Sequence, residues 1–516
     1  MAGFKKVFGA LLFLASIVIG SAAQGAADAD TQRFGGETQI GSRPPIPLHI
    51  ELRRSGDAVT GTLSTPIGNF ELLEAKWANP IVGHFRGNGG ASGALTLRLD
   101  GDVLTGTFDL GGQSGTFKAR RTTKDAAAFF RPPEQRFDLT AAQWLEDLDQ
   151  MVEILTKEHA SPFHRISRDQ FERDVAQLRA KLDGPKLDGI AVALEFRKLG
   201  ASIGDGHTSV ALPHGRDRLP VEFYWFDDGL RLVGISAAHR NLLGARLTAV
   251  NEVPVAEVTE RLRAYIAQGE TQLFDRASVP DFVNNPDILR AIGAGAGPSF
   301  VFTFETPDGA RKQVEITAVA EVRDEAILGD GKPLWQRNEA QGFWSEWLAD
   351  GSLYVNWRSY DGLADHATAL LQSLDARHPR RLIVDLRDNE GGDYTVGRSF
   401  IEGIASRLWL NQRGVLYVMI GRKTFSAAMT NAVDFKKTTA ATLVGEPAGA
   451  APNNWQEVRR TYLPNSGLSV GVSTRYYEFL PGQAELVPDL GAPPEPGDWG
   501  NLQDAGVRLV LAQPVR

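Results

Sequence analysis

The spacing of hydrophobic residues along the chain changes from one region to the next. Between residues 31 and 123, apolar and polar residues alternate in short runs such as 49–53 and 95–99, and Gly and Asp residues separate the runs. This alternation predicts antiparallel strands joined by tight turns. The tripeptide Gly-Thr-Leu/Phe also recurs, first at residues 61–63. We therefore predict an all-β accessory module over residues 31–123, a meander that closes into a small barrel or sandwich.

Helical spacing follows a linker that contains Pro132-Pro133. Apolar residues then recur at intervals of three and four, which is the spacing of one helix face. We predict a helical bundle over residues 138–215, with these stripes in its core. The stripes comprise Leu145, Leu148, Val152, Leu155, Phe171, Val175, Leu178 and Leu182. The bundle ends in Gly-Asp-Gly-His-Thr at residues 204–208, which places His207 on a loop before a short β run. A structural or surface histidine is the alternative interpretation.

Two further regions follow the bundle. Residues 219–335 are β-rich, and the order of strand, turn and helix over residues 242–255 resembles a PDZ-type module. Residues 342–516 alternate between strands and helices, which is the pattern of an α/β domain with its functional loops at the carboxyl ends of strands. The fold class predicted for the whole chain is therefore a multidomain α/β protein.

The most informative stretch of the α/β region surrounds Ser426. An apolar run at residues 415–420 leads into a short turn, then Ser426, then the small residues Ala427 and Ala428. This order predicts a strand, a tight turn and a helix with a serine at its start. A hydroxyl group there is exposed, and neighbouring amides can bind an oxyanion. The alternative is that Ser426 only caps the helix.

Composition excludes several classes of protein. The chain has 516 residues, enough for about three domains, with a net charge of -8 and no Lys/Arg block that would predict nucleic-acid binding. It has no cysteine, so disulfides, thiolate metal sites and a cysteine nucleophile are absent. Neither a His-Glu-x-x-His motif nor a phosphate-binding loop motif occurs. We expect no metal and no cofactor.

The N-terminus has the pattern of a signal peptide over residues 1–30. Lys5 and Lys6 precede an apolar core at residues 7–19, and small residues up to Ala23 form a cleavage site. A membrane anchor is the alternative, but an apolar core of about 13 residues is short for a span. No later segment is long and apolar enough to cross a bilayer. We predict cleavage near Ala23 and a periplasmic or secreted bacterial protein.

Three separate pieces together suit acyl transfer, which needs a nucleophile, a base and donors aimed at the developing oxyanion. Ser426 supplies the nucleophile and His207 the base. The amide of Gly391 or Gly392, with that of Ala427, supplies the oxyanion donors. A Gly-Gly loop suits this role because no Cβ blocks the approach of a carbonyl group.

Four motifs in this order resemble the C-terminal-processing and tricorn-type serine peptidase family, which includes tail-specific proteases and interphotoreceptor retinoid-binding protein. They are D-L-R-D-N-E-G-G (385–392), T-F-S-A-A (424–428), L-V-G-E-P (443–447) and G-D-G-H-T (204–208). The resemblance covers roughly residues 138–516. It implies a catalytic domain of the ClpP/crotonase-like type over residues 342–516. It also implies cleavage of peptides or unfolded proteins without metal or cofactor.

The resemblance also separates two catalytic variants. A Ser/Lys dyad would place its lysine at the position of Ala451, and no lysine follows Lys437. The family's other variant uses Ser, His and a late Glu, which implies Ser426, His207 and Glu485, with Glu478 as the alternative third member. Asp385, Arg387 and Asn389 are then expected to brace the Gly-Gly loop.

Two other functions remain open from the sequence. One is a catalytically inactive relative that binds peptides or small hydrophobic ligands, and the other is a related esterase or amidase. For the peptidase, a histidine base predicts that activity falls as the pH drops through about 6–7. The sequence leaves the oligomeric state and the ligand of the N-terminal module open.

Overall fold

The computed structural model describes residues 30–41, 45–66, 68–87, 92–110, 113–184, 188–320, 331–499 and 504–514. The predicted signal peptide therefore lies outside the described residues, apart from Asp30. The chain divides into two compact units, Met1–Glu134 and Gln135–Arg516. None of the helices in the described ranges combines the length and the hydropathy that a bilayer crossing requires.

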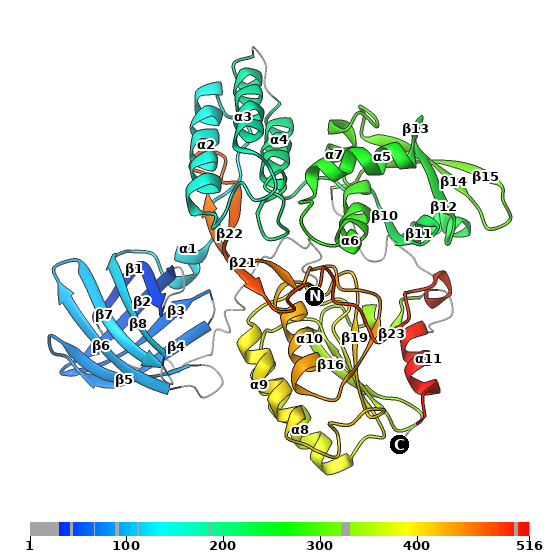
Figure 1. The fold of residues 1–516 in the computed structure, drawn as a ribbon. Coiled ribbons are helices and arrows are strands. Elements are labelled where there is room, and N and C mark those ends of the chain that lie inside the picture. Colours follow the sequence, from blue (N-terminus) through cyan, green and yellow to red (C-terminus); the bar gives the residue numbers. More distant parts are fainter. Residues whose placement is uncertain are drawn as a thin grey trace. The chain divides into compact units, whose positions relative to one another are not determined.

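The smaller unit is a closed antiparallel barrel, drawn in blue in Figure 1. Each strand pairs with the next one along the chain, and β8 pairs with β1 to close the sheet. Alternate side chains point inwards, and Phe34, Ile50, Leu52 and Leu104 are almost completely buried in the interior. The predicted all-β meander is confirmed, and it closes as a barrel. Its elements are β1 (Asp30–Ile40), β2 (Ile46–Ser55), β3 (Ala58–Thr65), β4 (Gly68–Lys76), β5 (Ile81–Gly87), β6 (Ser92–Asp100), β7 (Val103–Leu110), β8 (Gln113–Arg121) and α1 (Ala126–Phe130).

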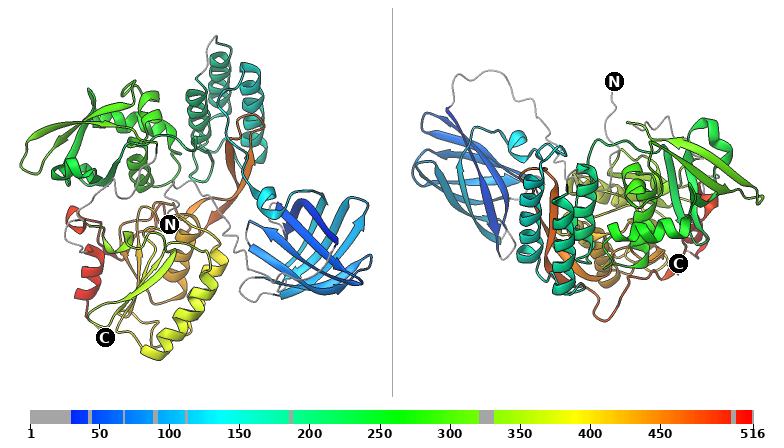
Figure 2. Two further views of the ribbon diagram at one scale, coloured as in Figure 1. Left: turned by 180° about the vertical axis from the view of Figure 1, so that it is seen from behind. Right: turned by 90° about the horizontal axis from the view of Figure 1, so that it is seen from above.

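The larger unit begins with a helical bundle. Thr140 and Gln143 form a capping box at the start of its first helix. Strands from far along the chain also pack into this bundle, as the orange strands beside the teal helices in Figures 1 and 2 show. One of them, β22, pairs with the short strand that follows the His207 loop. The elements are α2 (Ala141–Glu153), η1 (Ile154–Glu158), α3 (Arg168–Leu182), α4 (Gly189–Ala201), β9 (Ser209–Val210), β21 (Asn453–Tyr462) and β22 (Ser469–Glu478).

A six-stranded antiparallel sheet with short helices follows the bundle. Its strands run in the order β10-β11-β12-β14-β15, and β13 pairs with β12. Phe300, Phe302 and Phe304 lie on one face of β14 and are completely buried in its core. The elements are β10 (Val221–Phe226), β11 (Gly229–Ile235), η2 (Ala237–Leu242), β12 (Arg246–Val250), β13 (Val253–Pro254), α5 (Val255–Leu262), η3 (Arg263–Tyr265), α6 (Gln272–Val283), α7 (Pro286–Ala291), β14 (Ser299–Glu305) and β15 (Arg311–Thr317).

The last region is an α/β sheet with both faces covered. Its order is β16-β17-β18-β19-β20-β23, and all pairs except β16 with β17 are parallel. Leu353 and Val355 of β17 pack in the core that α8, α9 and α10 cover, whereas Tyr354 packs in the core that includes α11. The elements are η5 (Leu334–Gln336), β16 (Phe343–Trp347), β17 (Leu353–Trp357), α8 (Leu363–Arg377), β18 (Leu382–Asp385), α9 (Tyr394–Ala405), β19 (Leu416–Ile420), α10 (Ser426–Thr438), β20 (Thr442–Gly445), β23 (Leu490–Gly491), η6 (Pro496–Asp498) and α11 (Ala505–Ala512).

Candidate active site

Ser426 is the first residue of α10, at the sharp turn that follows β19. Its φ is +49°, in the left-handed region that non-glycine residues rarely adopt. Phe425, not Ser426, occupies the N-cap position of α10. The interpretation of Ser426 as a simple cap is therefore wrong, and the turn presents its hydroxyl group at the end of a buried parallel strand.

The loop that follows β18 lies against this turn. A Cβ on Gly391, whose φ is +116°, would stand 2.6 Å from the Ser426 Cβ and 3.1 Å from the Ala427 nitrogen. Only a glycine allows the loop to approach the serine this closely. The Gly391 N–H donates to Asn389 Oδ1 at 2.9 Å, so its donor is already engaged. Of the three expected oxyanion donors, the N–H groups of Gly392 and Ala427 therefore remain as candidates. Ala427 lies in the first turn of α10, where backbone amides lack intrahelical acceptors.

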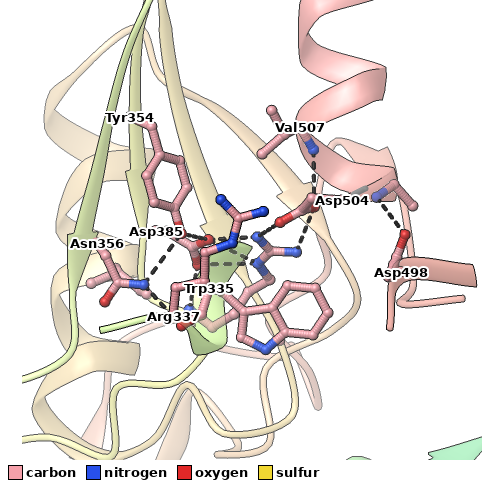
Figure 3. Close-up of polar contacts among 12 residues, drawn as sticks. Trp335, Arg337, Tyr354, Asn356, Asp385, Asp498, Asp504 and Val507 are labelled. Carbon is pink, nitrogen blue, oxygen red and sulfur yellow. Dashed lines mark hydrogen bonds and ion pairs between the residues drawn. The ribbon is translucent and has the colours of Figure 1, made fainter. Parts of the chain in front are cut away.

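A buried ion cluster fixes the start of the same loop. Arg387 Nη2 donates to Asp385 Oδ2 at 2.5 Å and to Asp504 Oδ2 at 2.6 Å. Figure 3 labels the two carboxylates, Asp385 and Asp504, together with Tyr354, which donates to Asp385 at 2.7 Å. Burial opposes the charge of Arg387, but the two carboxylates keep its pKa above the usual value. The ring of Trp335 covers the guanidinium group at 4.3 Å. These contacts support the predicted bracing role of this segment.

The side chain of Asp205 holds the backbone of the loop that carries His207. Asp205 Oδ1 accepts from the N–H groups of His207 and Thr208, both at 2.9 Å, and from Ser473 Oγ of β22 at 2.7 Å. Its other oxygen contacts His159 Nε2 at 2.7 Å. Burial opposes the ionisation of Asp205, but these hydrogen bonds outweigh it and lower the pKa. The ionised carboxylate thus ties the loop to β22 and to the bundle.

The His207 ring lies beside the Ser426 turn. It stacks on the ring of Phe425, with centroids 4.5 Å apart and an angle of 27° between the planes. The structure therefore brings the predicted base next to the residue that precedes the predicted nucleophile. Within the described ranges, neither ring nitrogen of His207 has a hydrogen-bond partner, so no hydrogen bond joins it to Ser426.

The buried environment of His207 changes its acid–base properties. The side chain is 6% exposed, and burial lowers the pKa to about 4, although the charge of Asp205 and the carbonyl group of Trp455 act in the opposite direction. The ring is neutral at neutral pH, as a general base must be. The prediction that His207 makes activity fall near pH 6–7 is therefore corrected, because desolvation moves its titration well below this range.

The expected third member does not reach the histidine. Glu485 is half-buried and precedes Leu486, whose carbonyl group accepts from the Ala448 N–H. Glu478 is exposed at the end of β22. Neither glutamate forms a hydrogen bond with His207, since both ring nitrogens lack partners in the part of the chain that the structure describes.

A carboxylate that the sequence did not indicate, Glu270, contacts both the His207 loop and the segment that carries Ala451. Glu270 Oε1 accepts from the Gly206 N–H at 3.2 Å, and Oε2 accepts from the Ala451 N–H at 2.8 Å. It belongs to the loop between η3 and α6, in the β-rich region. A single glutamate before a helix carries no pattern that would identify it. Within the described ranges, no group of three or more His, Asp or Glu side chains is arranged to hold a metal ion.

The glutamate of the L-V-G-E-P motif connects two regions of this unit. Glu446 forms a bidentate pair with Arg422, with two contacts of 2.8 Å. Arg422 also donates to the carbonyl group of Trp225 in β10 at 2.5 Å, and it lies over the ring of Tyr224. The turn before Ser426 is thus attached to the β-rich region.

Comparison with solved structures shows the fold. Mature CPAF matches with a TM-score of 0.50 and 13% identity over 72% of this chain and 96% of CPAF. Its complex with lactacystin gives a TM-score of 0.49 at 12% identity, covering 72% and 97% of the two chains. The photosystem II D1 C-terminal processing protease gives 0.35 at 12% identity, covering 69% and 94%. Comparison of the sequence with family models and with curated proteins found no match. The resemblance predicted from the motifs is therefore confirmed as a similarity of fold, and over 72% of its length this chain shares the fold of mature CPAF.

Proposed function

We propose that this chain is an exported serine peptidase that hydrolyses bonds in peptides or unfolded proteins, with Ser426 as nucleophile and His207 as base. The observation that carries the proposal is the turn at Ser426. Its left-handed backbone, its close approach to Gly391 and the His207 ring stacked on Phe425 support the assignment of a nucleophile, an oxyanion loop and a base. The similarity of fold to mature CPAF and the four motifs support the same conclusion.

The reaction follows from these positions. Ser426 Oγ attacks the carbonyl carbon of the substrate, and its proton passes to a nitrogen of His207. The N–H groups of Gly392 and Ala427 stabilise the oxyanion. His207 returns the proton to the leaving amine as the C–N bond breaks. Water then attacks the acyl-enzyme with His207 again as base, which releases the acid and restores Ser426.

Lysine is unsuited to replace this histidine. Lys423 lies three residues before Ser426, but the charges of Asp281, Asp388 and Glu390 raise its pKa above the usual value. A permanently charged ammonium group cannot accept a proton. Ala451 occupies the position expected for the lysine of a dyad, and its N–H is bound to Glu270. We therefore retain the Ser-His variant, and the PDZ-like nature of the β-rich region and the signal peptide remain part of the proposal.

A second candidate, an inactive relative that binds peptides, is favoured by two observations on His207. No hydrogen bond joins His207 to Ser426 in the described part of the chain, and Glu485 does not orient the ring. A catalytic pair nevertheless often tightens only when substrate binds. The peptidase and the binding protein make opposite predictions for covalent labelling.

The test is reaction with a peptidyl phosphonate followed by peptide mapping. We expect covalent labelling of Ser426, no labelling of Ser426→Ala and much slower labelling of His207→Ala. Ser399→Ala, on the exposed face of α9, is the matched control and should react as the natural protein does. Absence of labelling, together with saturable peptide binding that Ser426→Ala leaves unchanged, would favour the binding protein. Faster turnover of esters than of the matching peptides, with little amide hydrolysis, would indicate the esterase.

A further inference from the structure

Three loops of the larger unit meet at Glu270. The loop of residues 204–208 carries His207, and its Gly206 N–H donates to one carboxylate oxygen at 3.2 Å. The segment after β20 carries Ala451, whose N–H donates to the other oxygen at 2.8 Å. Glu270 therefore connects the loop of the base to a segment of the α/β region through both of its oxygens.

The surroundings of Glu270 are tightly packed. A Cβ on Gly206 would lie 2.7 Å from Glu270 Cγ and 2.8 Å from Phe425 Cζ. The next residue, Thr271, donates its hydroxyl group toward the carbonyl oxygens of Ala448 at 3.1 Å and Gly449 at 2.9 Å. The glutamate is thus fixed from its own loop and lies beside both the base loop and the residue before the nucleophile.

We propose that Glu270 is a positioning residue whose ionised carboxylate clasps Gly206 and Ala451, and that protonation of this carboxylate opens the clasp and displaces His207 from Ser426. The proposal rests on the proposed peptidase function. A carboxylate accepts at both oxygens, whereas a neutral carboxyl group has one acceptor oxygen and one hydroxyl group. Protonation therefore weakens one of the two backbone hydrogen bonds.

The charge state of Glu270 responds to the groups around it. Burial raises the pKa to about 7, and the nearby charge of Asp205 acts in the same direction. The N–H groups of Ala451 and Gly206 and the side chain of Asn454 oppose this rise. The ring of His207 is neutral near pH 7, and Arg165 donates to the carbonyl group of Gly269, the residue before Glu270, at 3.3 Å. The clasp is therefore expected to change near neutral pH.

The base loop also has space into which it can move. A cavity of about 40 Å³ adjoins Gly206 and is lined by Thr208, Ile266, Phe274 and Ser278 among others. An open clasp would allow the loop to shift toward this space. Burial lowers the pKa of His207 to about 4, so a change in activity near pH 7 that disappears in Glu270→Gln would report Glu270 and not the base.

The experiment measures the rate of phosphonate labelling of Ser426 from about pH 5 to 9. In the natural protein we expect the rate to rise roughly tenfold with a midpoint near pH 7, since one buried hydrogen bond of a charged group is gained. Glu270→Gln should remain at the low rate with no midpoint near 7. Glu270→Asp keeps the charge but is shorter, so it should retain a pH dependence at a lower rate. Glu260→Gln, an exposed glutamate in the same region, is the matched control.

A second measurement does not depend on activity. Infrared difference spectra of the natural protein should show loss of a protonated carboxyl stretch with the same midpoint as the labelling rate. Glu270→Gln should lack this change, which separates Glu270 from Glu390 and Asp498, whose pKa values burial also raises. The clasp is refuted if these midpoints differ, or if Glu270→Gln retains the tenfold rise. The peptidase function itself fails in a different way, since the natural protein would then show no labelling at any pH.

Discussion

The buried carboxyl group of Glu270 should make the stability of the protein depend on pH. Its pKa is raised from 4.5 to about 7 by burial, so the folded protein keeps a proton that the unfolded chain has already lost. The resulting stabilisation is fully present below pH 4.5 and is lost as the pH rises through 7. Integrating this difference between about pH 5 and pH 8 gives a loss of about 2.5 kcal/mol in the free energy of unfolding.

Glu270→Gln isolates this contribution, because glutamine does not titrate. A change in hydrogen bonding in the variant shifts its stability equally at both pH values and cancels in the difference. The assay is urea unfolding, followed by near-ultraviolet circular dichroism, of the natural protein and the variant at each pH. The natural protein should lose about 2.5 kcal/mol more than the variant between the two pH values. Equal losses in both proteins would show that the carboxyl group titrates normally and refute the reasoning.

Three further predictions concern the serine turn and its supports. Arg387→Met leaves two buried carboxylates without their cation and should lower the free energy of unfolding by about 3–5 kcal/mol. The control Arg398→Met breaks an exposed pair and should change the free energy of unfolding by less than about 1 kcal/mol. Urea unfolding measures both changes. Gly391→Ala places a Cβ 2.6 Å from the Ser426 side chain and should slow phosphonate labelling by about 100-fold or more while circular dichroism shows a folded protein. Ser426→Gly should be about 1 kcal/mol more stable than Ser426→Ala, because glycine adopts a φ of +49° without strain; equal melting temperatures would contradict this.

The sequence predicted the parts of the site that depend on local pattern. The apolar run before Ser426 and the small residues after it specify a strand and a helix, and the turn between them follows. Gly391 could be placed opposite the serine because the carboxyl ends of neighbouring parallel strands meet at one edge of a sheet. The barrel was also predictable from local pattern. Its strands show alternating apolar and polar residues, and each strand pairs with the next one along the chain.

The contacts that the sequence did not predict join residues far apart in the chain. Asp205 binds Ser473, 268 positions later, and Glu270 binds Ala451, 181 positions later. A single polar residue in a loop has no periodicity, so nothing local marks it as buried or paired. The choice of Glu485 depended on family spacing, and spacing alone does not determine where a loop carboxylate points. The lowered pKa of His207 could not be predicted either, because the shift from the ordinary histidine value depends on burial, which the residue type does not reveal.

The two halves of the proposed catalytic pair are supported in different ways. The turn of Ser426 is braced mainly within the α/β region, where Thr424 donates to the carbonyl group of Leu386 at 2.8 Å and Phe425 donates to that of Asn389 at 3.0 Å. The loop of His207 depends on a separate set of contacts, since Asp205 accepts from Ser473 of β22 and Glu270 accepts from Gly206 and Ala451. The nucleophile and its oxyanion loop can therefore remain in place while the base moves. For the proposed peptidase, we therefore expect that a shift of His207 alone changes the activity, without unfolding the turn that carries the serine.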